Sequence, residues 1–299
     1  MNLAGVNGSI AVSKTEGRGS NPWRGAKYIA LLLAFVTCFA SAHEPKKKKK
    51  KKVVTAETAS YVVYNNTKDA YEYIREKEKV RPIASVTKLM TAMVALNYDL
   101  NLNRELKIQS KVGGTLPRNK SYTRQELFGA MLVRSDNSAA ETLASDFPGG
   151  REAFIREMNK FANYIGMRDT NFDDPTGLSA ANTSTATDVA AMVAHAAQYT
   201  LIRETSTKKQ VEIDTQYKRK IRKLVLNNTN KPVLFNFDDI VVSKTGFTSR
   251  AGYCLALAVE RNNQRYSVVI LGSRNKQARI HKAEDILYNH IAYKDIDTN

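Results

Sequence analysis

Cysteine and histidine are both scarce in this chain of 299 residues, which contains two cysteines and four histidines. Cys38 lies inside an N-terminal apolar stretch, so removal of that stretch during export would leave Cys254 alone and exclude an intrachain disulfide. Cys254 sits in an apolar strand pattern and is interpreted as a core residue rather than a reactive thiol.

The histidines are badly placed for a serine–histidine–aspartate triad. His43 begins a lysine-rich linker. The other three fall in predicted helices that are distant in sequence from the motifs described below: His195, His281 and His290. A serine nucleophile in this chain would therefore need a base of another kind.

Long apolar runs are missing as well, with one exception from Tyr28 to Ala40. Arg24 and Lys27 precede this stretch, and Ala40-Ser41-Ala42 follows it as a small-x-small cleavage pattern. We therefore expect residues 1–42 to be a signal peptide. The segment that precedes the apolar stretch is unusually long for a signal peptide, so a translation start further along the chain stays open. The stretch is too short for a comfortable membrane span. The sequence predicts a soluble protein exported to the periplasm, with no stable membrane anchor after cleavage.

Acidic residues are in the minority, because 29 aspartates and glutamates face 46 lysines and arginines, for a formal net charge of +17. Seven of the lysines form one run, Lys46 to Lys52, inside a predicted linker over residues 43–57. Such a run is typical of a solvated linker, and it also binds polyanions weakly and without sequence preference. Adhesion to anionic lipid or wall polymer is therefore an alternative role for the run, whereas no nucleic-acid partner is predicted.

The remaining chain, residues 58–299, has the patterns of one globular domain. Apolar alternation predicts strands at 60–65, 69–76, 209–213, 223–228, 239–244, 252–260 and 266–273. Helical periodicity predicts helices at 85–96, 123–133, 139–147, 152–167, 188–198 and 277–292. The second helix opens with a capping box, Thr123-Arg-Gln-Glu126. Strands at both ends with helices between them predict an α+β fold, in which an antiparallel sheet is built from N- and C-terminal strands and is packed with helices.

Ser85 stands three residues before Lys88 at the start of a predicted helix, a spacing that places both side chains on one face. A serine hydroxyl becomes a nucleophile when a base takes its proton, and a neutral lysine amine can be that base. An unperturbed lysine, with a pKa of about 10.4, is neutral in only about one molecule in a few thousand at pH 7. The chemistry therefore requires burial or a nearby cation to lower the pKa of Lys88. Without these, the pair is a capping serine beside a solvated lysine.

Two further motifs follow in order along the chain. Ser135-Asp136-Asn137 comes directly after the capped helix, and Lys244-Thr245-Gly246 ends a predicted strand. Taken singly, the first is also typical of polar capping at a helix end, and the second of an exposed strand end. Chance matches occur too: Ser206-Thr-Lys-Lys209 repeats the first spacing, and Ser273-Arg-Asn275 repeats Ser-x-Asn out of order.

The three motifs in this order resemble the signature of the penicillin-recognising serine enzymes, which are D,D-peptidases and serine β-lactamases. The resemblance covers residues 58 to 290 and implies a β-lactamase/D,D-peptidase-like fold. It looks closest to the D-alanyl-D-alanine endopeptidases and carboxypeptidases among the low-molecular-mass penicillin-binding proteins. The segments that carry it are RPIASVTKLMTAMVAL, PGGREAFIREMN, DPTGLS, NNTN and SKTGFTSRAGYCL.

Two positions qualify the resemblance. Asp136 fills the middle of Ser-x-Asn, where related endopeptidases often carry glutamate. The segment DPTGLS offers Asp173 and Asp174 but no glutamate for deacylation, so we interpret it as a structural turn beside the site. This argues against an efficient β-lactamase.

The resemblance implies catalytic roles for four residues. Ser85 would be acylated, Lys88 would take its proton, and Lys244 could supply the cation that lowers the pKa of Lys88. Ser135 would relay a proton to the leaving amine. The backbone N–H groups of Ser85 and Phe247 would form the oxyanion hole.

It also implies a substrate-binding set. Asn137 would hydrogen-bond the substrate backbone, and Lys244 with Thr245 would hold the substrate carboxylate. Gly246 would let the strand backbone approach the ligand closely. An extended peptide substrate could pair with this strand by strand addition.

The function implied is hydrolysis of D-alanine-containing peptide bonds in peptidoglycan stem peptides through an acyl-enzyme. Endopeptidase cleavage of D-alanine–diaminopimelate cross-links is favoured over carboxypeptidase action, since the short segment after Gly246 leaves no room for the added domain and membrane helix of anchored carboxypeptidases. β-Lactams are expected as covalent inhibitors, and neither a cofactor nor a metal is expected. A catalytically inactive cell-wall-binding protein is the remote alternative.

Overall fold

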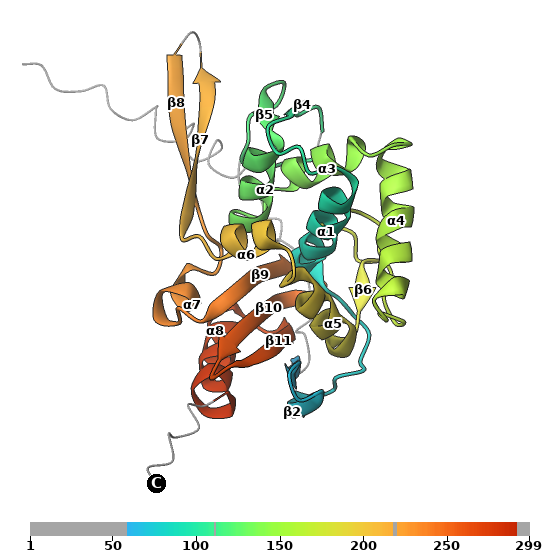
Figure 1. The fold of residues 1–299 in the computed structure, drawn as a ribbon, viewed down its shortest axis with the longest axis vertical. Helices are drawn as coiled ribbons and strands as arrows, with labels where there is room; N and C mark the ends of the chain where they lie inside the picture. The colour runs from blue at the N-terminus through green and yellow to red at the C-terminus, as the bar shows by residue number, and fades with distance from the viewer. Residues whose placement is uncertain (1–58, 111, 218–219, 292–299) are drawn as a thin grey trace, which may run out of the picture. The chain divides into compact units, whose positions relative to one another are not determined.

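The computed structural model describes residues 59–110, 112–217 and 220–291, which are drawn in colour in Figure 1. These residues belong to one compact unit of the chain. The predicted signal peptide (1–42) and lysine-rich linker (43–57) lie outside them, so the predicted domain boundaries stay predictions. Within the described ranges, no helix is both long and apolar enough to cross a membrane.

Strands from both ends of the described chain pair in one antiparallel sheet of order β2-β1-β11-β10-β9. Its strands are β1 (Ser60–Asn65), β2 (Ala70–Arg75), β9 (Ile240–Thr248), β10 (Gly252–Arg261) and β11 (Gln264–Ser273). β1 pairs with β11 from Ser60↔Leu271 to Asn65↔Tyr266, which joins the first strand to the last. The predicted α+β fold is therefore confirmed, and β9 stands at one edge of the sheet.

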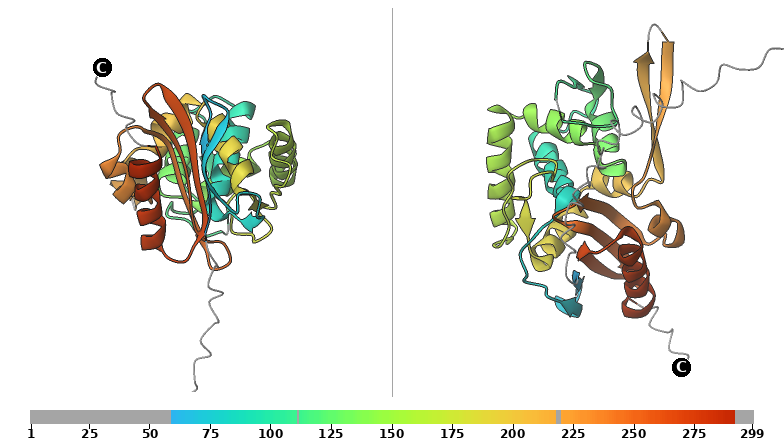
Figure 2. Two further views of the ribbon diagram at one scale, coloured as in Figure 1. Left: turned by 90° about the horizontal axis from the view of Figure 1, so that it is seen from below. Right: turned by 180° about the vertical axis from the view of Figure 1, so that it is seen from behind.

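Successive residues of β1, β10 and β11 face opposite sides of the sheet and enter two separate cores. Val62 lies in the larger core, which most of the helices share, whereas its neighbour Val63 lies in the smaller core. α5 (Ala186–Ala196) packs on the first face and α8 (Lys276–Asp285) on the second. Figure 2, left, shows the sheet with α8 on one side and the yellow and green helices on the other. The alternation of apolar residues along the strands thus determines which helices cover which face.

The helical block consists of α1 (Lys88–Tyr98), α2 (Arg124–Val133), α3 (Asn137–Ser145) and α4 (Gly150–Tyr164). The predicted capping box at the start of α2 is confirmed, because Thr123 and Glu126 each accept a hydrogen bond from the backbone N–H of the other. Asp136 caps α3 by accepting from the Ala139 N–H at 2.8 Å. These caps fix where the helices begin and so hold the α2–α3 junction in place.

The segment before α1 differs from the predicted helix from Ser85 onward. Residues Ala84–Thr87 form a 3-10 turn, η1, and the α-helix begins only at Lys88. Ala84 has a left-handed backbone (φ 48°), which does not fit a right-handed α-helix. Because side chains at i and i+3 eclipse in a 3-10 turn, Ser85 and Lys88 still lie on one face.

Two of the predicted C-terminal strands form a sheet of their own. β7 (Gln210–Tyr217) and β8 (Lys220–Asn227) pair as an antiparallel hairpin, which projects beside α2 in Figure 1. The sequence patterns also miss two short helices, α6 (Thr200–Ser206) and α7 (Lys231–Asn236). α6 packs against both α2 and β9.

Smaller elements complete the fold. β3 (Arg81–Pro82) pairs with β6 (Thr183–Ser184), and β4 (Glu105–Lys107) pairs with β5 (Ser121–Thr123). The C-terminal helix predicted over 277–292 is α-helical to Asp285 and continues as a π-helical turn, η2 (Ile286–His290).

Candidate active site

Three elements that are far apart in the sequence bring the predicted motif residues together: η1 with the start of α1, the α2–α3 junction, and β9. Lys88 Nζ lies 3.0 Å from Ser85 Oγ and 2.7 Å from Asn137 Oδ1. It also lies 2.6 Å from the carbonyl oxygen of Thr176, in the loop before β6. Lys88 is fully buried and Ser85 is half-buried, so this pair is not a capping serine beside a solvated lysine.

Ser135 and Lys244 form a second pair. Lys244 Nζ lies 2.9 Å from Ser135 Oγ and 2.9 Å from the carbonyl oxygen of Thr245. Lys244 is 1% exposed, which is unusual for a lysine that has no carboxylate contact among the described residues. Ser135 has a left-handed backbone (φ 64°), a conformation that a serine keeps only when its surroundings hold it there. Because Asn137 contacts Lys88, the Ser-x-Asn motif joins the two serine–lysine pairs into one site.

Two glycines allow other backbone segments to press against the turn that carries Ser85. A Cβ at Gly246 would lie 3.0 Å from the Ser85 nitrogen, so β9 meets the turn at its edge. A Cβ at Gly177 would lie 1.9 Å from the carbonyl oxygen of Ala84, and Gly177 also has a left-handed φ of +81°. Phe247, next along β9, is 54% exposed. An oxyanion hole made by the N–H groups of Ser85 and Phe247 stays a prediction.

Burial lowers the pKa of Lys88 from 10.5 to about 7. The carboxylates of Asp174, Asp136 and Glu141 act in the opposite direction, because negative charge favours the ammonium form. Of the two causes considered from the sequence, burial lowers the pKa of Lys88, whereas Lys244 is not among the groups that shift it. About half of the molecules carry a neutral Lys88 near pH 7, so a base lies within hydrogen-bonding distance of Ser85 at that pH.

Burial also lowers the pKa of Lys244 well below its usual value, and the charges of Lys88 and Arg279 add to this effect. Arg279 lies on α8 and is 3% exposed. Its Nε and Nη2 atoms have no hydrogen-bond partner among the described residues. Sequence reasoning missed Arg279, because it belongs to none of the motifs. Two buried cationic side chains near one strand make a place that favours an anion.

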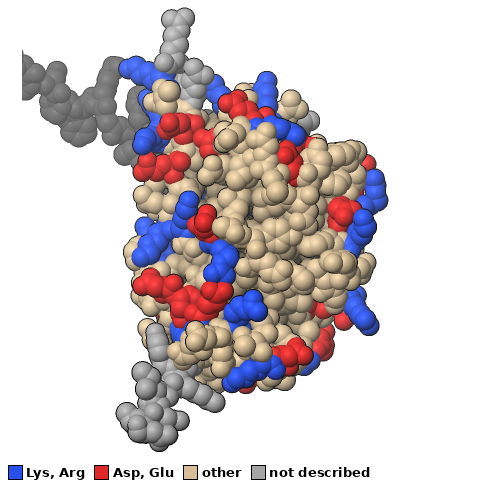
Figure 3. All heavy atoms as spheres, viewed as in Figure 1, with Lys and Arg blue, Asp and Glu red and all other residues tan. Residues whose placement is uncertain are grey.

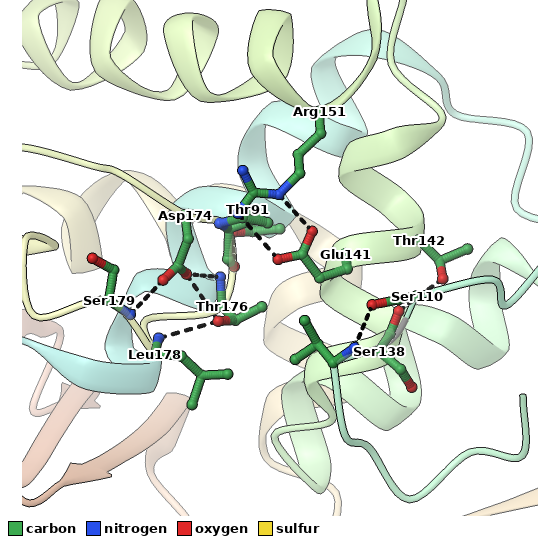
Figure 4. A network of polar contacts seen from close by, with 12 residues as sticks. Thr91, Ser110, Ser138, Glu141, Thr142, Arg151, Asp174, Thr176, Leu178 and Ser179 are labelled. Carbon is green, nitrogen blue, oxygen red and sulfur yellow. Dashed lines mark hydrogen bonds and ion pairs between the residues drawn. The ribbon is translucent and has the colours of Figure 1, made fainter.

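The segment DPTGLS forms a turn, as predicted, but it also contacts the candidate base through Thr176. Asp174 organises this turn: its carboxylate accepts from the Thr176 N–H at 2.5 Å and from Thr176 Oγ1 at 2.8 Å. Figure 4 shows Asp174 within the turn and, beside it, the ion pair in which Arg151 Nε lies 2.8 Å from Glu141 Oε2. The contact between Lys88 and the Thr176 carbonyl has no sequence signal, since a backbone oxygen is common to every residue.

The chance motif matches have structural roles. Ser206 is fully buried at the end of α6, where its Oγ accepts from the Ser243 N–H at 3.2 Å. Asn275 caps α8 by accepting from the Ala278 N–H at 2.7 Å. Cys254 is buried, and burial raises the pKa of its thiol to about 11, as expected for a core residue.

The three histidines that the structure describes make none of the contacts given above for the site residues. His195 is on α5, where burial lowers its pKa, and His290 stacks on Tyr73. His281 is within hydrogen-bonding distance of Gln277 on α8. In the part of the chain that the structure describes, no group of three or more histidine, cysteine, aspartate or glutamate side chains could hold a metal ion.

Comparison with known proteins gives one consistent family. The family profile described as D-alanyl-D-alanine carboxypeptidase matches residues 44–275. The D-alanyl-D-alanine endopeptidase of Escherichia coli K12 is 35% identical over 243 residues, which cover 79% of this chain and 75% of that protein. The D-alanyl-D-alanine endopeptidase of Pseudomonas aeruginosa is 33% identical over 253 residues, which cover 82% of this chain and 81% of that protein.

Solved structures show the same likeness. The D,D-transpeptidase of Streptomyces K15 superposes with a TM-score of 0.71 at 27% identity, covering 76% of this chain and 94% of that one. Penicillin-binding protein D2 of Listeria monocytogenes, in a cefotaxime-bound form, superposes with a TM-score of 0.67 at 28% identity and covers the same two shares.

Proposed function

The chain belongs to the D-alanyl-D-alanine carboxypeptidase family of serine D,D-peptidases, and on that basis we propose that it hydrolyses D-alanine-containing peptide bonds of peptidoglycan stem peptides through an acyl-enzyme on Ser85. The observation that carries this proposal is the buried Lys88, whose Nζ lies 3.0 Å from Ser85 Oγ. Because burial lowers the pKa of Lys88 to about 7, this lysine can accept the serine proton at neutral pH.

In the acylation step, Ser85 Oγ attacks the carbonyl carbon of D-alanine while its proton passes to Lys88 Nζ. The carbonyl oxygen becomes an oxyanion, which the N–H groups of Ser85 and Phe247 would stabilise. Asn137 holds Lys88 by the 2.7 Å contact and so keeps the base pointed at the nucleophile.

Collapse of the tetrahedral intermediate breaks the C–N bond, and the leaving amine must gain a proton. Ser135 Oγ would donate that proton, and Lys244, 2.9 Å from it, would replace the proton on Ser135. The proton that Lys88 took from Ser85 would in turn replace the one that Lys244 lost, so Lys88 would be neutral again before the ester is hydrolysed. An ester then joins the substrate acyl group to Ser85. Water, deprotonated by Lys88, hydrolyses this ester and restores the free serine.

Lys244 has a second proposed role in binding the substrate carboxylate. Burial and neighbouring cations lower its pKa, so an entering anion would favour the ammonium form and strengthen its own binding. Thr245 would assist from the same strand, where its Oγ1 donates to Thr229 Oγ1 at 2.7 Å. The buried Arg279 adds positive charge near the same place.

Within this class we favour an endopeptidase that cuts D-alanine–diaminopimelate cross-links. Both relatives described above are named endopeptidases, which supports this choice over a D-alanyl-D-alanine carboxypeptidase. A cross-link and a free pentapeptide both present a D-alanine carbonyl next to a carboxylate on a D-centre, so the same residues would serve either reaction. Supplying purified protein with dimeric and monomeric muropeptides, followed by chromatography, tests the choice. A higher kcat/KM for release of D-alanine from pentapeptide would favour the carboxypeptidase.

The setting of this reaction is proposed to be the periplasm, with β-lactams as covalent inhibitors. A catalytically inactive wall-binding protein that uses the lysine run 46–52 is the alternative, and that run lies outside the described residues. Figure 3 shows basic and acidic side chains interspersed around the margin of one face, with few of either near its centre, so this face offers no patch of a single sign.

Labelling with a fluorescent penicillin tests the proposed function directly. An acyl-enzyme-forming peptidase retains the label covalently after denaturation, and excess unlabelled penicillin prevents labelling. A protein that remains unlabelled while folded would contradict the proposed function and favour the wall-binding alternative.

A further inference from the structure

The middle residue of the Ser-x-Asn motif, Asp136, accepts hydrogen bonds with both of its carboxylate oxygens. Asp136 is 2% exposed. Its Oδ1 accepts from Ser138 Oγ at 2.6 Å and from the Ala139 N–H at 2.8 Å, which caps α3. Its Oδ2 accepts from the backbone N–H groups of Thr115 and Leu116, the latter at 3.0 Å. Oδ1 therefore binds the start of α3, and Oδ2 binds the loop that contains residues 113–116.

Gly114 shows how closely that loop approaches the motif. A Cβ at Gly114 would lie 2.3 Å from Ser138 Oγ and 2.4 Å from Asp136 Oδ1, which is closer than real Cβ atoms come. A Cβ at the neighbouring Gly113 would have no atom within 4 Å. The loop backbone at Gly114 thus lies directly against Asp136 and Ser138, and a side chain at this position would displace it.

The loop has an exposed part and an anchored part. Gly113, Gly114 and Thr115 are exposed, whereas Leu116 is 3% exposed and belongs to the larger core. Asp136 accepts one hydrogen bond from the N–H of Thr115 in the exposed part and one from the N–H of Leu116 in the anchored part. Asp136 stands between the two motif residues that contact the lysines, so the exposed segment sits on the same side of the site as the Ser-x-Asn motif.

We propose that the segment Gly113–Thr115, which we name the rim, contacts the part of a cross-linked substrate that extends beyond the reactive D-alanine, and that Asp136 is the positioning residue that holds it. The proposal rests on the proposed D,D-peptidase function. It assigns to the rim part of the enzyme's preference for large, cross-linked substrates. A peptide paired with the edge strand β9 lies between β9 and the Ser-x-Asn side of the site. A β-lactam occupies only the space near the nucleophile, whereas a second stem continues outward past the motif.

The chemistry of the rim suits a peptide partner. Two adjacent glycines leave their backbone N–H and C=O groups uncovered by side chains, so these groups can hydrogen-bond to the amides of a second stem. The rim carries no charged side chain, so it would recognise the backbone of the peptide. The site near Lys244 would recognise the carboxylate.

The variant Gly114→Ala tests this proposal, with Gly166→Ala, outside the rim, as its control. Gly114→Ala pushes the rim away from Asp136 and leaves every proposed catalytic side chain unchanged. We expect it to raise KM for a dimeric cross-linked muropeptide about tenfold, with kcat and the rate constant for acylation by benzylpenicillin each within about twofold of wild type. Gly166→Ala adds a methyl group in open space outside the rim, and we expect it to keep KM within about threefold.

A second variant covers the case in which Gly114→Ala lowers the thermal midpoint too far. Asp136→Asn keeps the shape of the side chain but turns one acceptor into a donor, which faces the N–H groups of Thr115 and Leu116. We expect kcat/KM for the dimer to fall at least about fivefold more than the penicillin acylation rate constant. Two results would contradict the proposed role of the rim. One is an equal decrease in kcat/KM for the dimer and in the rate constant for acylation by penicillin, and the other is an unchanged KM for the dimer in folded Gly114→Ala protein. A wild-type protein that takes up no penicillin would instead overturn the proposed function.

Discussion

Three segments of this chain place a serine three residues before a lysine, and in two of them the serine, Ser85 or Ser206, lies beside the same strand, β9. Ser85 is pressed against β9 at Gly246. Ser206 accepts a hydrogen bond from the N–H of Ser243, three residues earlier on β9. The two serines therefore share a spacing and a neighbouring strand, and these features do not separate them.

The lysines separate the two segments. Lys88 begins α1 on the face that carries the nucleophile and is fully buried. Lys209 follows the end of α6 and is exposed, with its Nζ 4.4 Å from the ring centroid of Phe235. Loss of hydration changes the proton affinity of an amine, and spacing alone does not. The comparison teaches that burial of the lysine, rather than the motif spacing, makes a base.

Exchange of each lysine for arginine gives the largest expected contrast. Arginine keeps the charge but cannot act as a base at accessible pH, so Lys88→Arg should reduce the rate constant for acylation by penicillin at least about 10³-fold. Lys209→Arg is the matched control and should stay within about twofold. Stopped-flow acylation measures both, and circular dichroism checks that each variant is folded. Wild-type-like acylation by Lys88→Arg would show that Lys88 is not the base.

The pH dependence of acylation should follow the protonation of Lys88. Because its pKa is lowered to about 7 and the neutral amine is required, the rate constant should rise about tenfold per pH unit below pH 7 and level off above it. Glu141→Gln removes a carboxylate that favours the ammonium form, so the midpoint should move to lower pH. A rate constant that is flat from pH 5 to pH 8 would contradict a lysine base.

Two glycines with left-handed backbones test the close packing that surrounds Ser85. Gly177→Ala places a Cβ 1.9 Å from the carbonyl oxygen of Ala84, whereas a Cβ at Gly166 meets no atom within 4 Å. We expect Gly177→Ala to lower the free energy of unfolding by about 3 kcal/mol and Gly166→Ala by about 1 kcal/mol. Urea unfolding measures both. Equal losses of stability would mean that the left-handed backbone alone requires a glycine at position 177, and that the contact with the η1 turn adds nothing.

Burial of Lys88 also predicts a pH-dependent stability. The folded state binds fewer protons than the unfolded chain between a pKa of about 7 and the ordinary value of 10.5, so the stability penalty of burial is present in full below pH 7 and is relieved as pH rises. Between pH 7 and pH 9 the wild type should gain about 2 kcal/mol more than Lys88→Met. Urea titrations of both proteins at the two pH values give this difference, and parallel curves would contradict the lowered pKa.

The sequence predicts much of the sheet, because strand residues alternate between two cores and the alternation is visible in segments such as 60–65 and 266–273. It also predicts the contact between Ser85 and Lys88, since a spacing of three places them on one face of a turn. Local patterns do not say which sheet a strand joins, so the separate β7–β8 hairpin is not foreseen.

Contacts across long sequence separations are the part of the site that the sequence does not predict. The Thr176 carbonyl reaches Lys88 from 88 residues away, and the buried Arg279 comes from the C-terminal helix. Asp136 occupies a variable motif position, and its hold on the loop depends on backbone N–H groups that have no residue signature. Tertiary packing decides all three.

Mass spectrometry of the protein after treatment with benzylpenicillin, followed by proteolysis, compares the two serines in a single experiment. Burial of Lys88 predicts a penicilloyl adduct on the peptide that contains Ser85 and an unmodified peptide around Ser206. An adduct on Ser206, or a labelled protein in which Ser85 is unmodified, would contradict the assignment of Ser85 as the nucleophile.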